Sequence, residues 1–237
     1  MRSVRTLVPA LAVVALVAAG CGSDDDTGST TTTEATTTST ADTTTTTEPA
    51  GLEQPAIWPA ADVVFTTPEA AAEDFVTQVL GVPPVLGEFQ QGDAGTGEIE
   101  LFSPDDDPSS RAVRGLLLMR QLGPDDGWFV LAVANDNASV TVPESGTTVA
   151  AGPLSVQGVA RGFEGNVNVR AFVAGDAIND LDQQITMGGS METPEPISAT
   201  LDLSGAATGD IVTILVRGGT GLETDPGEVG ALAVVIG

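Results

Sequence analysis

The sequence predicts a mainly β protein, with a β-sandwich over residues 139–237, a small α+β unit over residues 57–138 and a disordered tether before them. Three observations predict this organisation. Short stretches that alternate apolar and polar residues fill the second half of the chain, which is typical of strands with one solvated face. One stretch of helical periodicity precedes them. The chain begins with a short apolar run and a threonine-rich segment.

The N-terminal segment has the pattern of an export signal. Arg2 and Arg5 precede an apolar run over residues 7–19, which fits the core of a secretory signal and is too short to span a bilayer. The run ends in Leu-Val-Ala-Ala-Gly-Cys, which resembles the bacterial lipobox. The resemblance implies cleavage of residues 1–20 and attachment of lipid, including palmitate, to Cys21. The alternative is a retained membrane anchor in which Cys21 is a small buried residue.

The only cysteine of the chain has no partner for an intramolecular disulfide, which agrees with a role in lipid attachment. It opens a segment, residues 21–56, that contains few apolar residues and is rich in threonine. Such a segment cannot bury enough surface to offset the entropy lost on ordering, so we expect a disordered linker. Lipid and linker together predict a protein anchored at the extracytoplasmic face of the bacterial cell membrane.

The composition restricts the chemistry of the chain. There is no His, Lys or Tyr, which excludes Ser-His-Asp catalysis, histidine metal sites and catalytic lysines. The formal charge is −25, and it becomes about −27 once residues 1–20 are removed, because six Arg then remain against 33 acidic residues. A surface this acidic repels nucleic acid. We therefore expect no enzyme, no cofactor and no nucleic-acid partner.

The unit over residues 57–138 begins with helix signals. Thr66 or Thr67 can cap the helix, Pro68 suits its first turn and Gly81 ends it. Strand patterns follow at residues 98–102, 113–122 and 128–134, and the last two are joined by a turn over residues 123–127. Both Trp58 and Trp128 are expected in the core of this unit rather than on a ligand platform. We predict one helix on a small antiparallel sheet.

The unit over residues 139–237 starts after a break near residues 135–139 and contains strand patterns only. Alternation at Leu201 and Val169 predicts that these residues point inward, whereas Asp202 and Arg170 point outward. A third series, at residues 212, 214 and 216, has the same period. About a hundred residues of short alternating strands fit a β-sandwich of immunoglobulin type.

The sequence Pro-Leu-Ser-Val-Gln-Gly-Val-Ala over residues 153–160, followed by Phe163, Glu164 and Gly165, resembles the immunoglobulin-like domain of bacterial spore germination proteins. The resemblance covers residues 139–236. It implies an extracytoplasmic β-sandwich, often carried on a lipoprotein, with no known catalytic residues.

Two groups of residues are candidates for contacts with a ligand or partner. Phe163 and Glu164 would form a recognition contact at a sheet edge, or else Phe163 packs and Glu164 accepts backbone hydrogen bonds. A second group, Asp105, Asp106 and Asp107, lies between prolines and would either coordinate Ca²⁺ or form a solvated acidic turn.

A carboxylate pair offers the one catalytic arrangement that the composition allows. The spacing of Asp180 and Asp182 predicts that both lie on one face of a strand, and two carboxylates are the minimum apparatus of a glycosidase. No aromatic residue nearby supplies a sugar platform, so we assign no catalytic residue.

Three functions are compatible with this sequence. The first is a non-enzymatic, surface-anchored envelope lipoprotein that acts as an interaction or scaffold module for an envelope protein or a cell-wall partner. The second is a lipoprotein that binds a soluble ligand and delivers it to a membrane complex. The third is an envelope hydrolase that works through carboxylates. A flat or strand-edge surface would favour the first, an apolar pocket the second and convergent carboxylates the third.

Overall fold

A computed structural model describes residues 52–105 and 107–237. The predicted signal, Cys21, most of the predicted linker and Asp106 lie outside the described residues. Twelve strands in two sheets and one α-helix make up the regular structure of the described part, which confirms the mainly β fold class. None of its helices has the length and apolar character needed to cross a membrane.

The predicted helix forms at the expected place. Helix α1 (Pro68–Phe75) is capped by Thr67, whose Oγ1 accepts a hydrogen bond of 3.3 Å from the amide of Ala70. A π-helical turn, η1 (Val76–Leu80), continues it. The chain leaves the helix at Gly81, whose φ of 68° is left-handed and therefore suits glycine.

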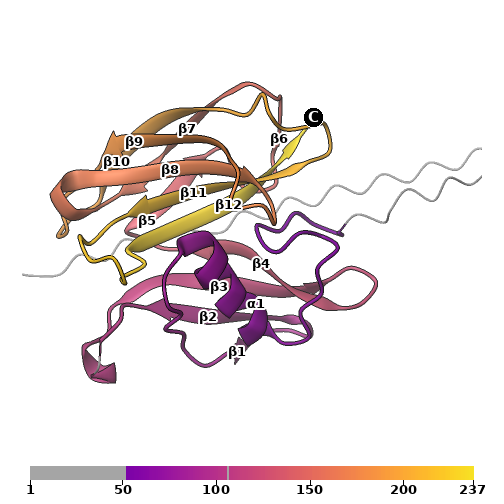
Figure 1. The fold of residues 1–237 in the computed structure, drawn as a ribbon, viewed down its shortest axis with the longest axis horizontal. Helices are drawn as coiled ribbons and strands as arrows, with labels where there is room; N and C mark the ends of the chain where they lie inside the picture. Colours follow the sequence, from indigo (N-terminus) through magenta and orange to yellow (C-terminus); the bar gives the residue numbers. More distant parts are fainter. Residues whose placement is uncertain (1–51, 106) are drawn as a thin grey trace, which may run out of the picture. The chain divides into compact units, whose positions relative to one another are not determined.

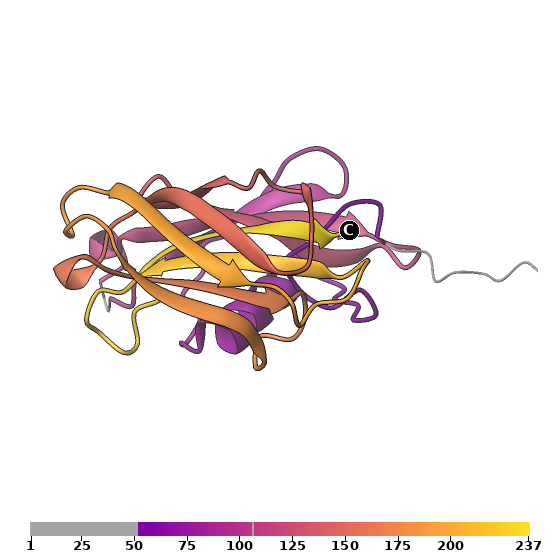
Figure 2. The ribbon, with the colours of Figure 1, turned by 90° about the horizontal axis from the view of Figure 1, so that it is seen from above.

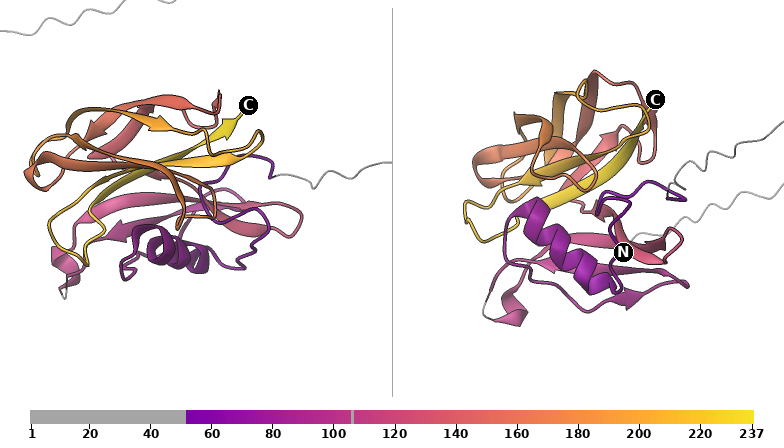
Figure 3. Two further views of the ribbon diagram at one scale, coloured as in Figure 1. Left: turned by 45° about the horizontal axis from the view of Figure 1, so that its top comes forward. Right: turned by 45° about the vertical axis from the view of Figure 1, so that its right-hand side comes forward.

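The helix packs on an antiparallel sheet, as predicted. The strands lie in the order β1 (Gln90–Gln91), β2 (Thr96–Phe102), β3 (Val113–Leu122) and β4 (Gly127–Ala134). Apolar residues of α1 and η1 share one core with residues of β2, β3 and β4. Figures 1 and 3 show the helix against these strands, with the C-terminal strands on its other side.

Two facing sheets form the predicted sandwich. One has the order β10-β7-β5, and the other runs β9-β8-β11-β12 with β6 paired in parallel to β12. The strands are β5 (Ala138–Val142), β6 (Thr148–Val149), β7 (Pro153–Ala160), β8 (Asn166–Val173), β9 (Asp180–Met187), β10 (Glu195–Asp202), β11 (Ile211–Gly218) and β12 (Glu228–Ile236). The two layers cross one above the other in Figure 2. Leu201 and Val169 are fully buried between them, as expected from the alternation.

The two units share one sheet. Strand β12 pairs with β4 through Ala231 and Val133, so the larger sheet continues from β1 to β9 across both units. The predicted break near residues 135–139 falls at the turn between β4 and β5. The division of the chain into these two domains stays a prediction.

The sheet formed by β8, β11 and β12 is covered on both faces, which differs from the sequence expectation. Thr213 and Leu215 alternate with the predicted apolar series of β11, yet both are fully buried. Leu215 and Phe172 belong to the core that contains α1, because the N-terminal unit packs on this face. The expected solvated face of β11 is therefore an internal surface.

Two arginines of the sandwich bind the C-terminal end of the helix. Arg170 Nη1 donates to the carbonyl oxygen of Val79 at 3.2 Å, and Arg217 Nη1 donates to that of Leu80 at 3.0 Å. Both cations satisfy carbonyls at the negative end of the helix dipole. Arg170 points away from the sandwich core, as expected, but it faces the helix rather than solvent; Asp202 is exposed as predicted.

Candidate functional site

Three loops gather at one end of the sandwich. They connect β7 to β8 (residues 161–165), β9 to β10 (residues 188–194) and β11 to β12 (residues 219–227). Each follows a strand that runs toward this end, because the paired strands are antiparallel. Loops at one end of an immunoglobulin-like sandwich are held by the rigid sheets and are well placed for binding.

A buried carboxylate holds two of these loops and the junction between the units. Glu228 is 0% exposed, and its carboxylate forms ion pairs with Arg114 at 3.1 Å and Arg161 at 2.8 Å. Its other oxygen accepts hydrogen bonds from the side-chain amides of Asn135 at 3.0 Å and Asn137 at 3.4 Å. A buried charge needs such compensation, so this network fixes the start of β12 against the β7–β8 loop.

Two arginines, Arg114 and Arg217, bind the loop over residues 219–227. Arg114 Nη2 pairs with the carboxylate of Asp225 at 2.7 Å, and the other oxygen of Asp225 accepts the amide of Gly227 at 2.8 Å. Arg217 donates to the carbonyl oxygens of Asp225 at 3.1 Å and Pro226 at 2.6 Å. Burial lowers the pKa of Arg217, the nearby Arg170 lowers it further, and Asp225 acts in the opposite direction.

Exposed apolar side chains stand on and beside these fixed loops. Phe163 is 51% exposed, Leu222 65%, Met187 64% and Ile185 73%. The amide of Phe163 donates to the carbonyl oxygen of Gly219 at 2.7 Å, so the first loop is tied to the third. We call the four side chains Phe163, Ile185, Met187 and Leu222 the loop-end surface.

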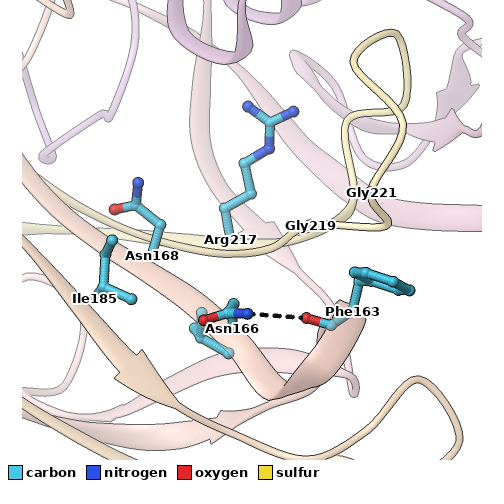
Figure 4. Close-up of a pocket in the computed structure, with 8 residues that line it drawn as sticks. Phe163, Asn166, Asn168, Ile185, Arg217, Gly219 and Gly221 are labelled. Carbon is cyan, nitrogen blue, oxygen red and sulfur yellow. Dashed lines mark hydrogen bonds between the residues drawn. The ribbon is translucent and has the colours of Figure 1, made fainter.

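A groove of about 410 Å³ is lined by Phe163 and Ile185 of this surface. Ile185, Asn168 and Arg217 stand side by side in its wall on β9, β8 and β11, since they are register partners. Figure 4 shows Asn168 and Arg217 pointing the same way, with Phe163 at the other end beside Gly219 and Gly221. The Oδ1 atom of Asn168 is buried without a hydrogen-bond partner. The groove is lined by apolar side chains, the amides of Asn166 and Asn168 and the guanidinium of Arg217, and its lining contains no carboxylate.

The sequence singled out two residues of this region and missed the others. Phe163 is half exposed and Glu164 is exposed, with a left-handed φ of 55° at Glu164. Phe163 is therefore only partly packed, and the role of both residues in recognition stays a prediction. Ile185 and Met187 were missed, although their i, i+2 spacing on β9 places two apolar residues on one face.

The acidic segment between β2 and β3 forms hydrogen bonds within its own loop. Asp107 caps a short 3₁₀ helix, η2 (Pro108–Ser110), by accepting the amide of Ser109 at 2.9 Å, and Asp105 accepts the amide of Asp107 at 2.9 Å. The hydroxyl and amide of Ser109 lower the pKa of Asp107. The structure describes no cluster of three acidic, His or Cys side chains in its residues that suits a metal ion. Calcium binding here stays a prediction, because Asp106 lies outside the described residues.

The predicted pair of Asp180 and Asp182 does not share a face. A bulge makes Asp182 the partner of Ala171 and Asp180 the partner of Phe172, so the two carboxylates project to opposite sides. Asp180 pairs with Arg170 at 2.7 Å, whereas Asp182 accepts the amide of Asp202 at 2.9 Å. The spacing rule failed because it assumes an unbroken strand.

Both tryptophans lie in the core, as predicted. Trp58 is 6% exposed, and its Nε1 donates to Asp74 at 2.8 Å. Trp128 is 9% exposed and meets Phe89 edge to face, with 5.2 Å between the ring centroids. Neither ring lines the groove.

Comparison with protein families identifies the sandwich. Residues 137–217 match the immunoglobulin-like domain of bacterial spore germination. The match confirms the family resemblance of this immunoglobulin-like domain and ends within β11, so β12 lies outside it. This family of immunoglobulin-like domains is not typically enzymatic. No curated protein and no solved structure matched the chain.

Proposed function

We propose that this protein is a non-enzymatic interaction module of the bacterial envelope, held at the extracytoplasmic face of the cell membrane by lipid on Cys21, and that it binds its partner through the loop-end surface. One observation carries the proposal. Two large apolar side chains, Phe163 and Ile185, are each more than half exposed and line one groove at the end of the sandwich where three loops meet, with exposed Met187 and Leu222 following on the same strand and in the third loop. Contiguous exposed apolar surface marks sites of protein interaction.

The rigidity of this region favours binding. The loops are fixed by the ion pairs of Glu228 and Asp225 and by the bond between Phe163 and Gly219. A partner that binds a fixed surface loses little conformational entropy on the protein side. Full burial of an exposed Leu, Met or Phe contributes about 1.5 to 3 kcal/mol, so a few such contacts suffice for a specific complex.

The anchor is supported by the sequence alone. The lipobox-like end of the apolar run and the single cysteine support lipid on Cys21. The resemblance to the spore germination domain, which implies an extracytoplasmic location, agrees with export.

A small soluble ligand is the second candidate for this surface. The groove of about 410 Å³ lies within the range of small-molecule sites, roughly 300 to 1,000 Å³, and the unpartnered Oδ1 of Asn168 offers it one acceptor. However, Phe163 and Ile185 stand more than half in solvent and do not enclose a ligand. This exposure favours a macromolecular partner.

Photo-crosslinking in intact cells tests the proposal. A photoreactive residue in place of Phe163 should give a discrete adduct, whereas the same residue in place of Ile178 should not. Ile178 is the matched control because it is 86% exposed and lies in the loop at the other end of the sandwich. Equal adducts from both positions, or adducts from Ile178 alone, would place the contact elsewhere and refute the proposed surface.

Palmitate labelling tests the anchor separately. Cys21→Ser should abolish incorporation of labelled palmitate and release the protein from the membrane fraction. Incorporation that persists in this variant would show that the lipoprotein assignment is wrong.

A further inference from the structure

Each of the three loops at the loop-end surface carries the same dipeptide, an apolar residue followed directly by glutamate. The pairs are Phe163-Glu164, Met191-Glu192 and Leu222-Glu223. All three glutamates are exposed. Because the loops meet at one end of the sandwich, each loop brings one exposed carboxylate to the end that carries the apolar side chains.

Within residues 52–105 and 107–237, no cation forms an ion pair with the carboxylates of Glu164, Glu192 or Glu223. The arginines at this end are already engaged, because Arg114 and Arg161 pair with buried carboxylates. The third arginine there, Arg217, donates to three backbone carbonyls.

A metal ion and a second copy of the chain do not fit this arrangement. In the part of the chain that the structure describes, no three acidic side chains lie close enough to hold a metal ion. A second copy carries the same formal charge of −25 and would repel the carboxylates. Its own arginines are few, six in residues 52–237, and most are engaged within the protein.

We propose that the partner of the loop-end surface is a protein segment with an apolar side chain flanked by lysine or arginine. This rests on the proposed function and names the chemistry of its partner. The apolar residue enters the groove beside Phe163, and the flanking cations face the three glutamates. An apolar centre with a charged rim is the usual anatomy of a protein interface, and the rim charges set the partner and the association rate.

Three synthetic peptides test this charge preference. They share the centre Leu-Phe-Leu and carry two Lys, two Ser or two Glu on each side, and their binding to the full chain in detergent is measured by fluorescence anisotropy. The Lys-flanked peptide should bind roughly tenfold more tightly than the Ser-flanked peptide. Its advantage should shrink as salt is raised, because exposed charges are screened.

A charge-reversal variant with a matched control locates the effect. The triple variant Glu164→Lys, Glu192→Lys and Glu223→Lys should lose the preference for Lys flanks and prefer Glu flanks. The control, Glu88→Lys, Glu98→Lys and Glu100→Lys, makes the same change in net charge at exposed positions of the N-terminal unit and should keep the original preference.

Replacement of the apolar Phe163 tests the contribution of the groove separately from that of the three glutamates. Phe163→Ser should weaken all three peptides, and Ile178→Ser should weaken none. Weakening by Phe163→Ser without any effect of the flanks would leave the proposed surface in place and overturn the cationic partner. Absence of binding by every peptide, or the same preference in the reversal variant and its control, would also overturn it. Self-association abolished by Phe163→Ser would show that a second copy occupies the surface.

Discussion

The buried carboxylate of Glu228 holds the loops at this end of the sandwich. Replacement of Glu228 by glutamine should therefore lower the free energy of unfolding. Glu228→Gln keeps the size of the side chain and removes its charge. Arg114 retains Asp225 at 2.7 Å, whereas Arg161 retains only a bond of 3.4 Å to the carbonyl oxygen of Glu192. One guanidinium therefore loses its counter-ion.

The magnitude follows from burial. Removal of one partner of a buried ion pair costs about 3 to 5 kcal/mol of the free energy of unfolding. The side chain of Arg161 is 22% exposed, so water compensates part of its charge. We expect a loss at the lower end, about 3 kcal/mol.

Urea unfolding of the full chain measures this loss, with tryptophan fluorescence and circular dichroism as parallel probes. Both tryptophans lie in the N-terminal unit, and most strands lie in the sandwich, so the two probes report different units. The loss should persist at high salt, because buried pairs are screened little. Glu98→Gln, at an exposed strand position, is the control and should stay within about 0.5 kcal/mol. A loss for Glu228→Gln no larger than this control would refute the reasoning.

Two further predictions concern the sandwich. Leu201→Ala should cost about 2 to 5 kcal/mol in denaturant unfolding, because Leu201 is fully buried, whereas Thr200→Ala at the exposed neighbouring position should stay within about 0.5 kcal/mol; equal effects would contradict the assigned faces. The amide of Asp202 lowers the pKa of Asp182 below its ordinary 3.8, so the stabilisation by its carboxylate is present above that pH and is lost as the pH falls through the lower folded pKa. The difference in unfolding midpoint between the wild type and Asp182→Asn should therefore shrink in acid, and a constant difference from about pH 6 to pH 2 would refute this role.

Local signals predicted the helix and most strands well. Thr67, Pro68 and Gly81 occupy the cap, first-turn and end positions that their chemistry favours, and the strand over residues 113–122 has the predicted bounds. These features depend on residues that are close together in the sequence, so local residue patterns predict them.

Features that depend on distant segments were not predictable in the same way. The period of β11 indicated one solvated face, but Leu215 is covered by the N-terminal unit, which no pattern within the strand records. The bulge that separates Asp180 from Asp182 likewise follows from pairing with β8. Of the candidate site, Phe163 and Glu164 were recognised from their residue types, whereas Ile185 lines the groove with Phe163 only because β9 pairs with β8.

The attachment of the first described segment has a mechanical consequence. Ile57 donates to the carbonyl oxygen of Val130 at 2.9 Å, Val130 donates back to Trp58 at 2.8 Å, and the hydroxyl of Thr213 donates to the carbonyl oxygen of Ile57 at 3.0 Å. A force applied to the chain before Ile57 would therefore act on β4 of one unit and on β11 of the other at the same point. Since β11 is an interior strand of the shared sheet, the load passes directly into the sandwich. Tension along the chain would therefore reach the sandwich, at whose end the loop-end surface lies, without first extending the helix-bearing unit.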